Sequence, residues 1–239
     1  MSKESKKLAK KKSTKDLVFI INNLFIFITT VIAVPVTLII GSRTTRMDGG
    51  DIPYWQHVAT FTILSGIFLG LVAGVSAFTY IYAKFTKIQI PHKKAITIWY
   101  LIATTASMIT CLTVLIYLAP ARVITKGGKY LDLIAEMMFF LHFLNPLLSA
   151  ITYVFATDNI QINFRTRLLT TLPIVIYSVP YVLCVMVFKI WPDFYGLTFG
   201  GRYYLAPVAF AVFIMLSLVI STGLIKIKNV LQNKFCVIS

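Results

Sequence analysis

The residues of this 239-residue chain that could do chemistry are a few polar side chains inside long apolar stretches. Four of them are spaced at i, i+3, i+7 and i+10, which places them on one face of a helix: His142, Asn145, Ser149 and Thr152. Apolar residues flank this polar stripe, so we expect it to face the protein interior. An ionisable group such as His142 inside an apolar stretch indicates a functional site, but structural histidines that bind a carbonyl group are common too.

A hydroxyl group at Thr62 is the second candidate. Three glycines follow it at four-residue spacing and predict a face on which another helix packs closely: Gly66, Gly70 and Gly74. Thr62 lies one turn before them on the same face, so its hydroxyl is expected to point inward, with Ser65 on the next ridge. Thr62 could equally be one more small packing residue whose hydroxyl binds the carbonyl group of Val58.

Together, the two candidates would suit nucleophilic catalysis. A threonine hydroxyl is a weak nucleophile at neutral pH and needs a base within about 3 Å, which a neutral imidazole can provide. At 1.5 Å per helical residue, Thr62 lies ~12 Å below Tyr54 and His142 ~15 Å below Asp132. If both helices begin at the outer face of the membrane, Thr62 and His142 share one layer, and they can meet there only if their helices are neighbours.

Six apolar stretches must position these side chains. They cover roughly 17–40, 55–83, 95–118, 131–156, 168–188 and 204–225, and each has the ~20 residues needed to cross ~30 Å of hydrocarbon. The composition is 58% hydrophobic and 13% charged, which excludes an ordinary water-soluble domain. We predict an all-α protein, a bundle of six transmembrane helices over residues 17–228. A basic cytoplasmic segment, 1–16, precedes it, and a short cytoplasmic tail, 229–239, follows.

The net charge of +15 is distributed between the stretches and not along one face, which argues against a nucleic-acid partner. Sixteen of the 23 Lys and Arg residues lie before residue 17, after residue 225 or in the second and fourth loops, and seven lie in the other three loops. By the positive-inside rule, both termini are expected in the cytoplasm of a protein in the cell membrane. Membrane lipids are then its expected partners.

The three cysteines form no CxxC pair and no spacing typical of metal ligands. Two of them, Cys111 and Cys184, fall inside apolar stretches and are expected to pack there. We therefore expect neither a metal nor an organic cofactor.

Three short segments resemble the androgen-induced-gene family of six-helix membrane proteins and its uncharacterised bacterial relatives. Residues 61–65 are similar to the family's Phe-Thr-x-x-Ser, residues 141–146 to its Leu-His followed by Pro, and residues 191–195 to an aromatic-Pro-aromatic loop. Animal members are threonine hydrolases that cleave fatty acid esters of hydroxy fatty acids. The resemblance implies that Thr62 is the nucleophile and His142 the base.

Two functions from different classes follow. In the first, the protein is an intramembrane hydrolase of lipid esters, in which Thr62 and His142 are catalytic and Ser65 or Asn145 steadies the imidazole or the oxyanion. In the second, it is a non-enzymatic carrier, channel or assembly partner, whose polar stripe lines a path or joins helices. The aromatic loop from Trp191 to Tyr204 would cap a site in the first case and serve as an interfacial anchor in the second.

Overall fold

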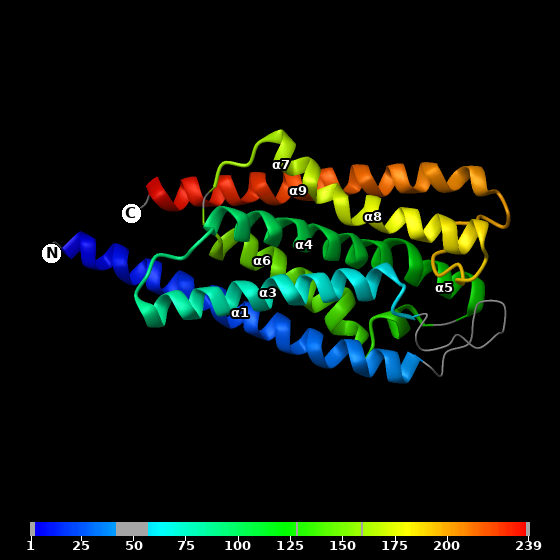
Figure 1. Ribbon diagram of the computed structural model, residues 1–239, viewed down its shortest axis with the longest axis horizontal. Coiled ribbons are helices and arrows are strands. Elements are labelled where there is room, and N and C mark those ends of the chain that lie inside the picture. Colours follow the sequence, from blue (N-terminus) through cyan, green and yellow to red (C-terminus); the bar gives the residue numbers. More distant parts are fainter. Residues whose placement is uncertain (1–2, 42–56, 128, 159, 238–239) are drawn as a thin grey trace.

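The computed structural model describes residues 3–41, 57–127, 129–158 and 160–237. The fold is 82% helical, and the described residues contain no strand. The all-α prediction is therefore confirmed. The long helices run side by side along the longest axis of the molecule (Figure 1).

The chain forms successive helical segments that pass between the two ends of this bundle (Figure 1). The first three are α1 (Lys3–Gly41), α3 (Phe61–Thr86) and α4 (Lys93–Thr113), which continues through a π-helical turn, η1 (Val114–Leu118), into α5 (Ala119–Lys126). Next come the short 3-10 helix η2 (Tyr130–Leu133), the π-helical η3 (Phe140–Leu144) and α6 (Asn145–Ala156). The next pass consists of α7 (Phe164–Leu168), η4 (Leu169–Thr171), α8 (Leu172–Tyr181) and η5 (Val182–Val187). The last pass consists of η6 (Tyr203–Leu205) and α9 (Ala206–Val237).

Five helical segments of the described chain are long and apolar enough to cross a membrane, as expected of an integral membrane protein: Ser13–Ile39, Phe61–Thr86, Lys93–Ala121, Phe164–Val187 and Tyr203–Gln232. The predicted span 131–156 is shorter, because its helix covers Phe140–Ala156 alone. Glu136 has a left-handed backbone, with φ 53°, which an α-helix cannot contain. The apolar composition continues across this break, and for that reason the sequence pattern did not indicate it.

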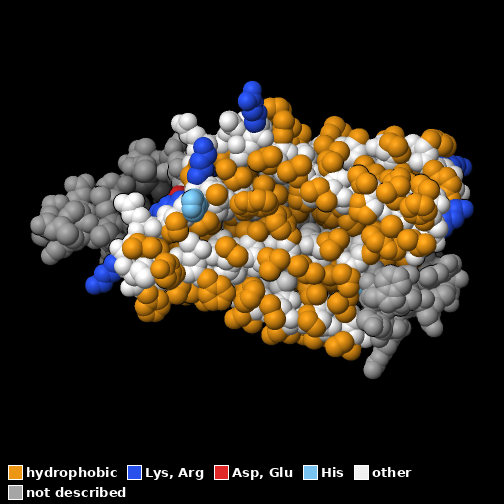
Figure 2. All heavy atoms as spheres, in the orientation of Figure 1, with side chains coloured by type: hydrophobic (Ala, Val, Ile, Leu, Met, Phe, Trp, Pro, Cys, Tyr) orange, Lys and Arg blue, Asp and Glu red, His pale blue; other side chains and the backbone are white. Residues whose placement is uncertain are grey.

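The two ends of the bundle differ in what they contain. Both chain termini lie at one end, together with the loops after α3 and after α6 (Figure 1). On the face drawn in Figure 2, hydrophobic side chains cover the middle of the molecule, and most Lys and Arg side chains lie toward its ends, with one projecting from the upper edge. This distribution matches a protein whose middle is surrounded by hydrocarbon. We call the end with the termini the basic end, and the other end, where α8 and η5 lead into η6, the aromatic end.

Prolines account for two of the three π-helical turns. Pro120 follows η1 and Pro146 follows η3, whereas Pro180 lies inside α8, before η5. A proline has no N–H group to donate to the carbonyl four residues earlier, so the helix widens locally or bends. One of these turns, η3, contains His142.

Helix α3 packs closely on its neighbours through its glycines. A Cβ atom at Gly70 would lie 2.7 Å from Cγ2 of Thr30, and one at Gly74 would lie 2.7 Å from Cδ2 of Phe27, both on α1. At Gly66 the Cβ would lie 3.1 Å from Cδ2 of Leu141 in η3. The three glycines thus allow α1 and η3 to approach α3, with Thr62 one turn nearer the aromatic end.

Candidate functional site

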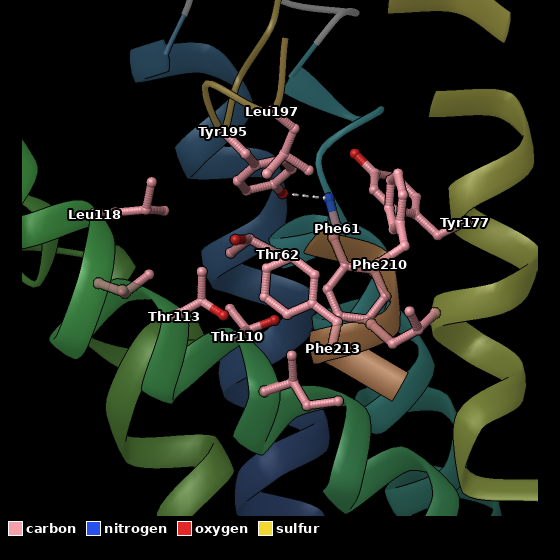
Figure 3. Close-up of a pocket in the computed structure, with 13 residues that line it drawn as sticks. Phe61, Thr62, Thr110, Thr113, Leu118, Tyr177, Tyr195, Leu197, Phe210 and Phe213 are labelled. Atoms are coloured by element: carbon pink, nitrogen blue, oxygen red, sulfur yellow. Dashed lines mark hydrogen bonds between the residues drawn. The ribbon is translucent and has the colours of Figure 1, made fainter. Parts of the chain in front are cut away.

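Thr62 lies beside a small cavity at the aromatic end. The cavity has a volume of about 30 Å³, and its walls come from α3, α4, η1, α8, α9 and the loop before η6. Figure 3 shows Thr62 below the ring of Tyr195, with Thr110 and Thr113 on the other side. The remaining lining residues are apolar or aromatic: Phe61, Ile109, Val114, Leu118, Ile174, Tyr177, Leu197, Phe210 and Phe213. The buried Thr62 is thus one of five lining residues with a hydroxyl group, and the other eight are apolar.

Tyr195, from the loop between η5 and η6, closes this cavity. Its hydroxyl accepts a hydrogen bond from the backbone N–H of Phe61 at 2.7 Å (Figure 3). The rings of Tyr177 and Tyr181 lie 6.5 and 6.0 Å from its ring. The hydroxyl of Tyr177 donates to the carbonyl of Ala59 at 3.0 Å. Two tyrosines therefore bind the start of α3, immediately before Thr62.

Asp193 fixes the conformation of this loop. Its carboxylate accepts hydrogen bonds from the backbone N–H groups of Leu197 at 2.9 Å and Thr198 at 2.8 Å, and from the hydroxyl of Tyr181. Burial alone would raise the pKa of Asp193, but the hydrogen bonds from Tyr181, Thr198 and Leu197 outweigh it and lower the pKa. Asp193 is thus an ionised side chain that holds Tyr195 in place.

Tyr195 itself stays neutral. Burial raises the pKa of its hydroxyl to about 12, although the backbone N–H groups of Phe61 and Thr62 and the hydroxyls of Tyr177 and Thr62 act in the opposite direction. A neutral phenol that accepts from an N–H still has its own proton to donate. The hydroxyl of Tyr195 is therefore a hydrogen-bond donor beside Thr62.

Ser65 joins α3 to α4. Its hydroxyl lies 2.9 Å from the hydroxyl of Thr110, and it donates to the carbonyl of Thr62 at 3.1 Å. Thr110 also lines the cavity, so this pair joins Ser65 to the cavity wall. Ser65 thereby positions the turn of α3 that contains Thr62.

His142 lies outside the cavity. Its side chain is 5% exposed, and Nδ1 lies 2.5 Å from the carbonyl oxygen of Leu133 in η2. Within the described part of the chain, no hydrogen bond joins His142 to Thr62. The η3 turn does contact α3, because Leu141 packs against Gly66.

Asn145 binds α1 and not His142. Its Oδ1 accepts from the hydroxyl of Thr29 at 3.0 Å, and its Nδ2 donates to the hydroxyl of Thr30 at 3.3 Å. Thr152 behaves similarly, since its hydroxyl accepts from Nδ2 of Asn22 on α1 at 3.0 Å, whereas the hydroxyl of Ser149 donates to the carbonyl of Pro146 in its own helix at 2.8 Å. The four side chains of the stripe are buried, as their spacing predicts, and two of them, Asn145 and Thr152, connect α6 to α1.

Sequence reasoning placed Thr62 and Ser65 in one site but did not identify Tyr195, Tyr177 or Thr110 as their neighbours. The one signal for these neighbours was the aromatic loop over residues 191–204, for which the sequence left two roles open, a cap over the site and an interfacial anchor. In the part of the chain that the structure describes, no three His, Cys, Asp or Glu side chains lie close enough to hold a metal ion. Comparisons of the chain with protein-family models, curated proteins and solved structures gave no match.

Proposed function

We propose that this integral membrane protein hydrolyses lipid esters within the bilayer, with Thr62 as nucleophile and His142 as base. The observation that favours it most is the buried hydroxyl of Thr62 beside an apolar cavity. At about 30 Å³ the cavity has room for only about one or two water molecules, so an acyl chain can enter only if the lining side chains move apart. The chain would then lie against these apolar walls, with the ester carbonyl at the hydroxyl. The resemblance of residues 61–65 and 141–146 to the androgen-induced-gene family supports the same assignment.

The hydrogen bond of His142 supports a role as base. A carbonyl oxygen only accepts hydrogen bonds, so Nδ1 must bear the proton that Leu133 receives. In the neutral imidazole, Nε2 is then unprotonated and can accept a proton. The reaction requires Nε2 to come within about 3 Å of the threonine hydroxyl when substrate is bound.

The reaction would proceed through an acyl-enzyme. Oγ1 of Thr62 attacks the ester carbonyl while Nε2 of His142 takes the hydroxyl proton, and the same nitrogen then returns this proton to the leaving alcohol. Water next attacks the acyl-threonine, gives its proton to Nε2, and releases the fatty acid, after which the proton returns to Thr62. Tyr195 donates to the oxyanion. Ser65 and Asn145 are positioning residues, because they bind Thr110 and α1.

The location of the protein is part of the proposal. We infer a cell-membrane protein with both termini in the cytoplasm, because sixteen of the 23 basic residues lie before residue 17, within 84–94, within 157–167 or after residue 225. The cavity beside Thr62 would then lie toward the outer leaflet.

A lipid-like fluorophosphonate probe tests the proposal on protein purified in detergent. Wild type should form an adduct on Thr62, and Thr62→Val and His142→Ala should reduce labelling by at least a hundredfold at matched folding. Thr113→Val is the control, since it removes a hydroxyl from the same cavity and should label normally. Equal labelling of Thr62→Val and wild type would exclude Thr62 as the nucleophile.

A second candidate is a non-enzymatic carrier, channel or assembly partner. It is favoured by the partners that the polar residues already have: Ser65 binds Thr110, Asn145 binds Thr29 and Thr30, and His142 binds Leu133. Such bonds stabilise helix bundles without chemistry. This candidate predicts no probe adduct in well-folded protein, and for a carrier or channel it predicts a vesicle flux that His142→Ala changes.

A further inference from the structure

A second hollow lies at the basic end, far along α3 from Thr62. It is an open cleft of about 590 Å³ between the start of α1, the end of α3 and the loop from Lys87 to His92. The cleft is lined by Ser13, Asp16, Ile20, Tyr80, Ala83, Lys84, Lys87, Ile88, Gln89, Ile90 and Lys93. It shares no residue with the cavity beside Thr62.

The charges on this cleft are mostly positive. Three lysines line it, Lys84, Lys87 and Lys93, against a single lining carboxylate, Asp16. Lys84 and Lys87 are exposed, and Lys93 is half-buried and pairs with Asp158 at 3.1 Å. The excess of positive charge indicates an anionic ligand.

The walls of the cleft are amphipathic. Its lining includes the buried side chains Ile20, Tyr80 and Ala83, which are at most 7% exposed, while the lysines supply the polar part. Next to the cleft, Tyr82 and Phe85 on α3 are 60% and 83% exposed. Aromatic side chains at the end of an apolar helix are typical of the headgroup level of a membrane. A ligand here would therefore meet lysines and apolar surface at the depth of lipid headgroups.

We propose that this cleft binds the phosphate headgroup of an anionic phospholipid, with Lys84 and Lys87 as the phosphate ligands and the apolar wall against the start of an acyl chain. Lysine ammonium groups donate three hydrogen bonds each and bind phosphate as point charges. A soluble phosphate would use the same lysines but would gain nothing from Ile20 and Ala83. The amphipathic lining and the position of the cleft therefore favour the lipid.

The test measures binding of phosphatidylglycerol and phosphatidylcholine to the full-length protein by native mass spectrometry. Phosphatidylglycerol should bind preferentially to wild type, and Lys84→Ala/Lys87→Ala should weaken it about thirtyfold, which corresponds to ~1 kcal/mol per lysine. The control is Lys94→Ala/Arg165→Ala, which removes two exposed positive charges from the same end but outside the cleft, and should lose threefold or less. Lys84→Arg/Lys87→Arg should retain binding.

Three outcomes would overturn the proposal. One is equal binding of the two lipids to wild type, and another is equal loss in the cleft variant and its control. The third is full displacement of the lipid by inorganic phosphate at millimolar concentration, which would assign the cleft to a soluble anion. If the double variant unfolds, Lys84→Gln and Lys87→Gln measured singly decide the question, because both side chains are exposed. None of these outcomes depends on hydrolysis at Thr62.

Discussion

The two ends of the bundle hold their connecting loops by opposite means. At the aromatic end, the carboxylate of Asp193 accepts from two backbone N–H groups and a tyrosine hydroxyl. At the basic end, lysines donate to the segment after α6: Lys15 to the carbonyl of Thr157 at 2.8 Å, and Lys228 to the hydroxyl of Thr157 at 2.6 Å and the carbonyl of Asp158 at 2.5 Å. One end uses a fixed anion and the other uses fixed cations.

This difference follows from the backbone groups that each loop leaves without partners. The loop before η6 turns so that its N–H groups point inward, and an acidic side chain satisfies them. The segment after α6 begins at a helix C-terminus, where carbonyl groups are left without N–H partners and cations are favoured. The bias of basic residues toward one end, a topology signal in the sequence, is therefore also part of the packing of that end.

The two hollows follow the same division. The aromatic end encloses a cavity of about 30 Å³ among tyrosines and phenylalanines, whereas the basic end opens a cleft of about 590 Å³ beside three lysines. The first suits a neutral group sheltered from water, and the second suits an anion at the membrane surface. Variants that act on one end alone test whether the ends are independent.

The largest effect is expected from Asp193→Asn. The amide keeps the size of the side chain, but it replaces a charged acceptor of three hydrogen bonds by one neutral acceptor and an NH₂ group that faces donors. We expect a loss of about 3 kcal/mol in stability, measured by thermal unfolding in detergent, and looser packing of Tyr195 on α3. Glu136→Gln is the control, because it makes the same change at an exposed position. An equal loss in both variants would contradict the role of Asp193.

The same carboxylate predicts a pH dependence. Because the pKa of Asp193 is lowered in the folded protein, its contribution is fully present above the ordinary aspartate pKa of about 3.9. That contribution is lost as the pH falls through the lowered value. Wild type should thus lose more stability than Asp193→Asn below about pH 4, so that the two curves converge in acid. Parallel curves from pH 7 down to pH 2 would show that folding does not lower the pKa of Asp193, and would contradict the stabilisation of its ionised form by these hydrogen bonds.

Thr157→Val is expected to have the next largest effect, at the basic end. Valine keeps the shape of this buried side chain but removes the hydroxyl that accepts from Lys228, so the ammonium is left with the carbonyl of Asp158. Loss of a buried hydrogen bond to a charged group should cost about 2 kcal/mol in unfolding free energy. Thr86→Val should cost under about 0.5 kcal/mol, since Thr86 is exposed and its hydroxyl binds only the carbonyl of Tyr82. A similar loss in the two variants would mean that Lys228 does not anchor this segment.

Local features of the fold could be predicted from the sequence, whereas contacts between distant residues could not. The apolar stretches gave the all-α class and the long helices, since hydrophobic length and composition are local properties. Gly70 and Gly74 lie on a close-packed face, as their spacing predicts. The break at Glu136 was not predicted, because the residues around it are as apolar as a helix would be.

The partners of the candidate residues could not be predicted, because they depend on which helices are neighbours. Asn145 or Ser65 was expected to steady the imidazole or the oxyanion, and the fold gives Asn145 the partners Thr29 and Thr30 on α1. Tyr195 reaches the start of α3 across 134 residues of sequence, a contact that no periodicity encodes. A candidate site can thus be located on a face from the sequence, while its chemical neighbours require the fold.

The smallest effect is expected from Tyr195→Phe. This variant removes the hydroxyl of Tyr195 but keeps its ring in place at the cavity, so it tests the hydrogen bond apart from the aromatic packing. The first N–H groups of an α-helix have no partners within the helix, and the hydroxyl of Tyr195 satisfies the N–H of Phe61, the first residue of α3. Phenylalanine keeps the ring among Tyr177 and Tyr181 and removes this single hydrogen bond, so we expect a loss of about 1 kcal/mol.

Amide hydrogen exchange gives the more local readout of this variant. The Phe61 amide should exchange about fivefold faster in Tyr195→Phe, whereas amides at the basic end, around Thr157, should not change. The exposed Tyr204 at the same end provides the control Tyr204→Phe, for which no change at Phe61 is expected. Faster exchange at both ends would mean that the loop at the aromatic end stabilises the whole bundle, and that the two ends are coupled and not independent.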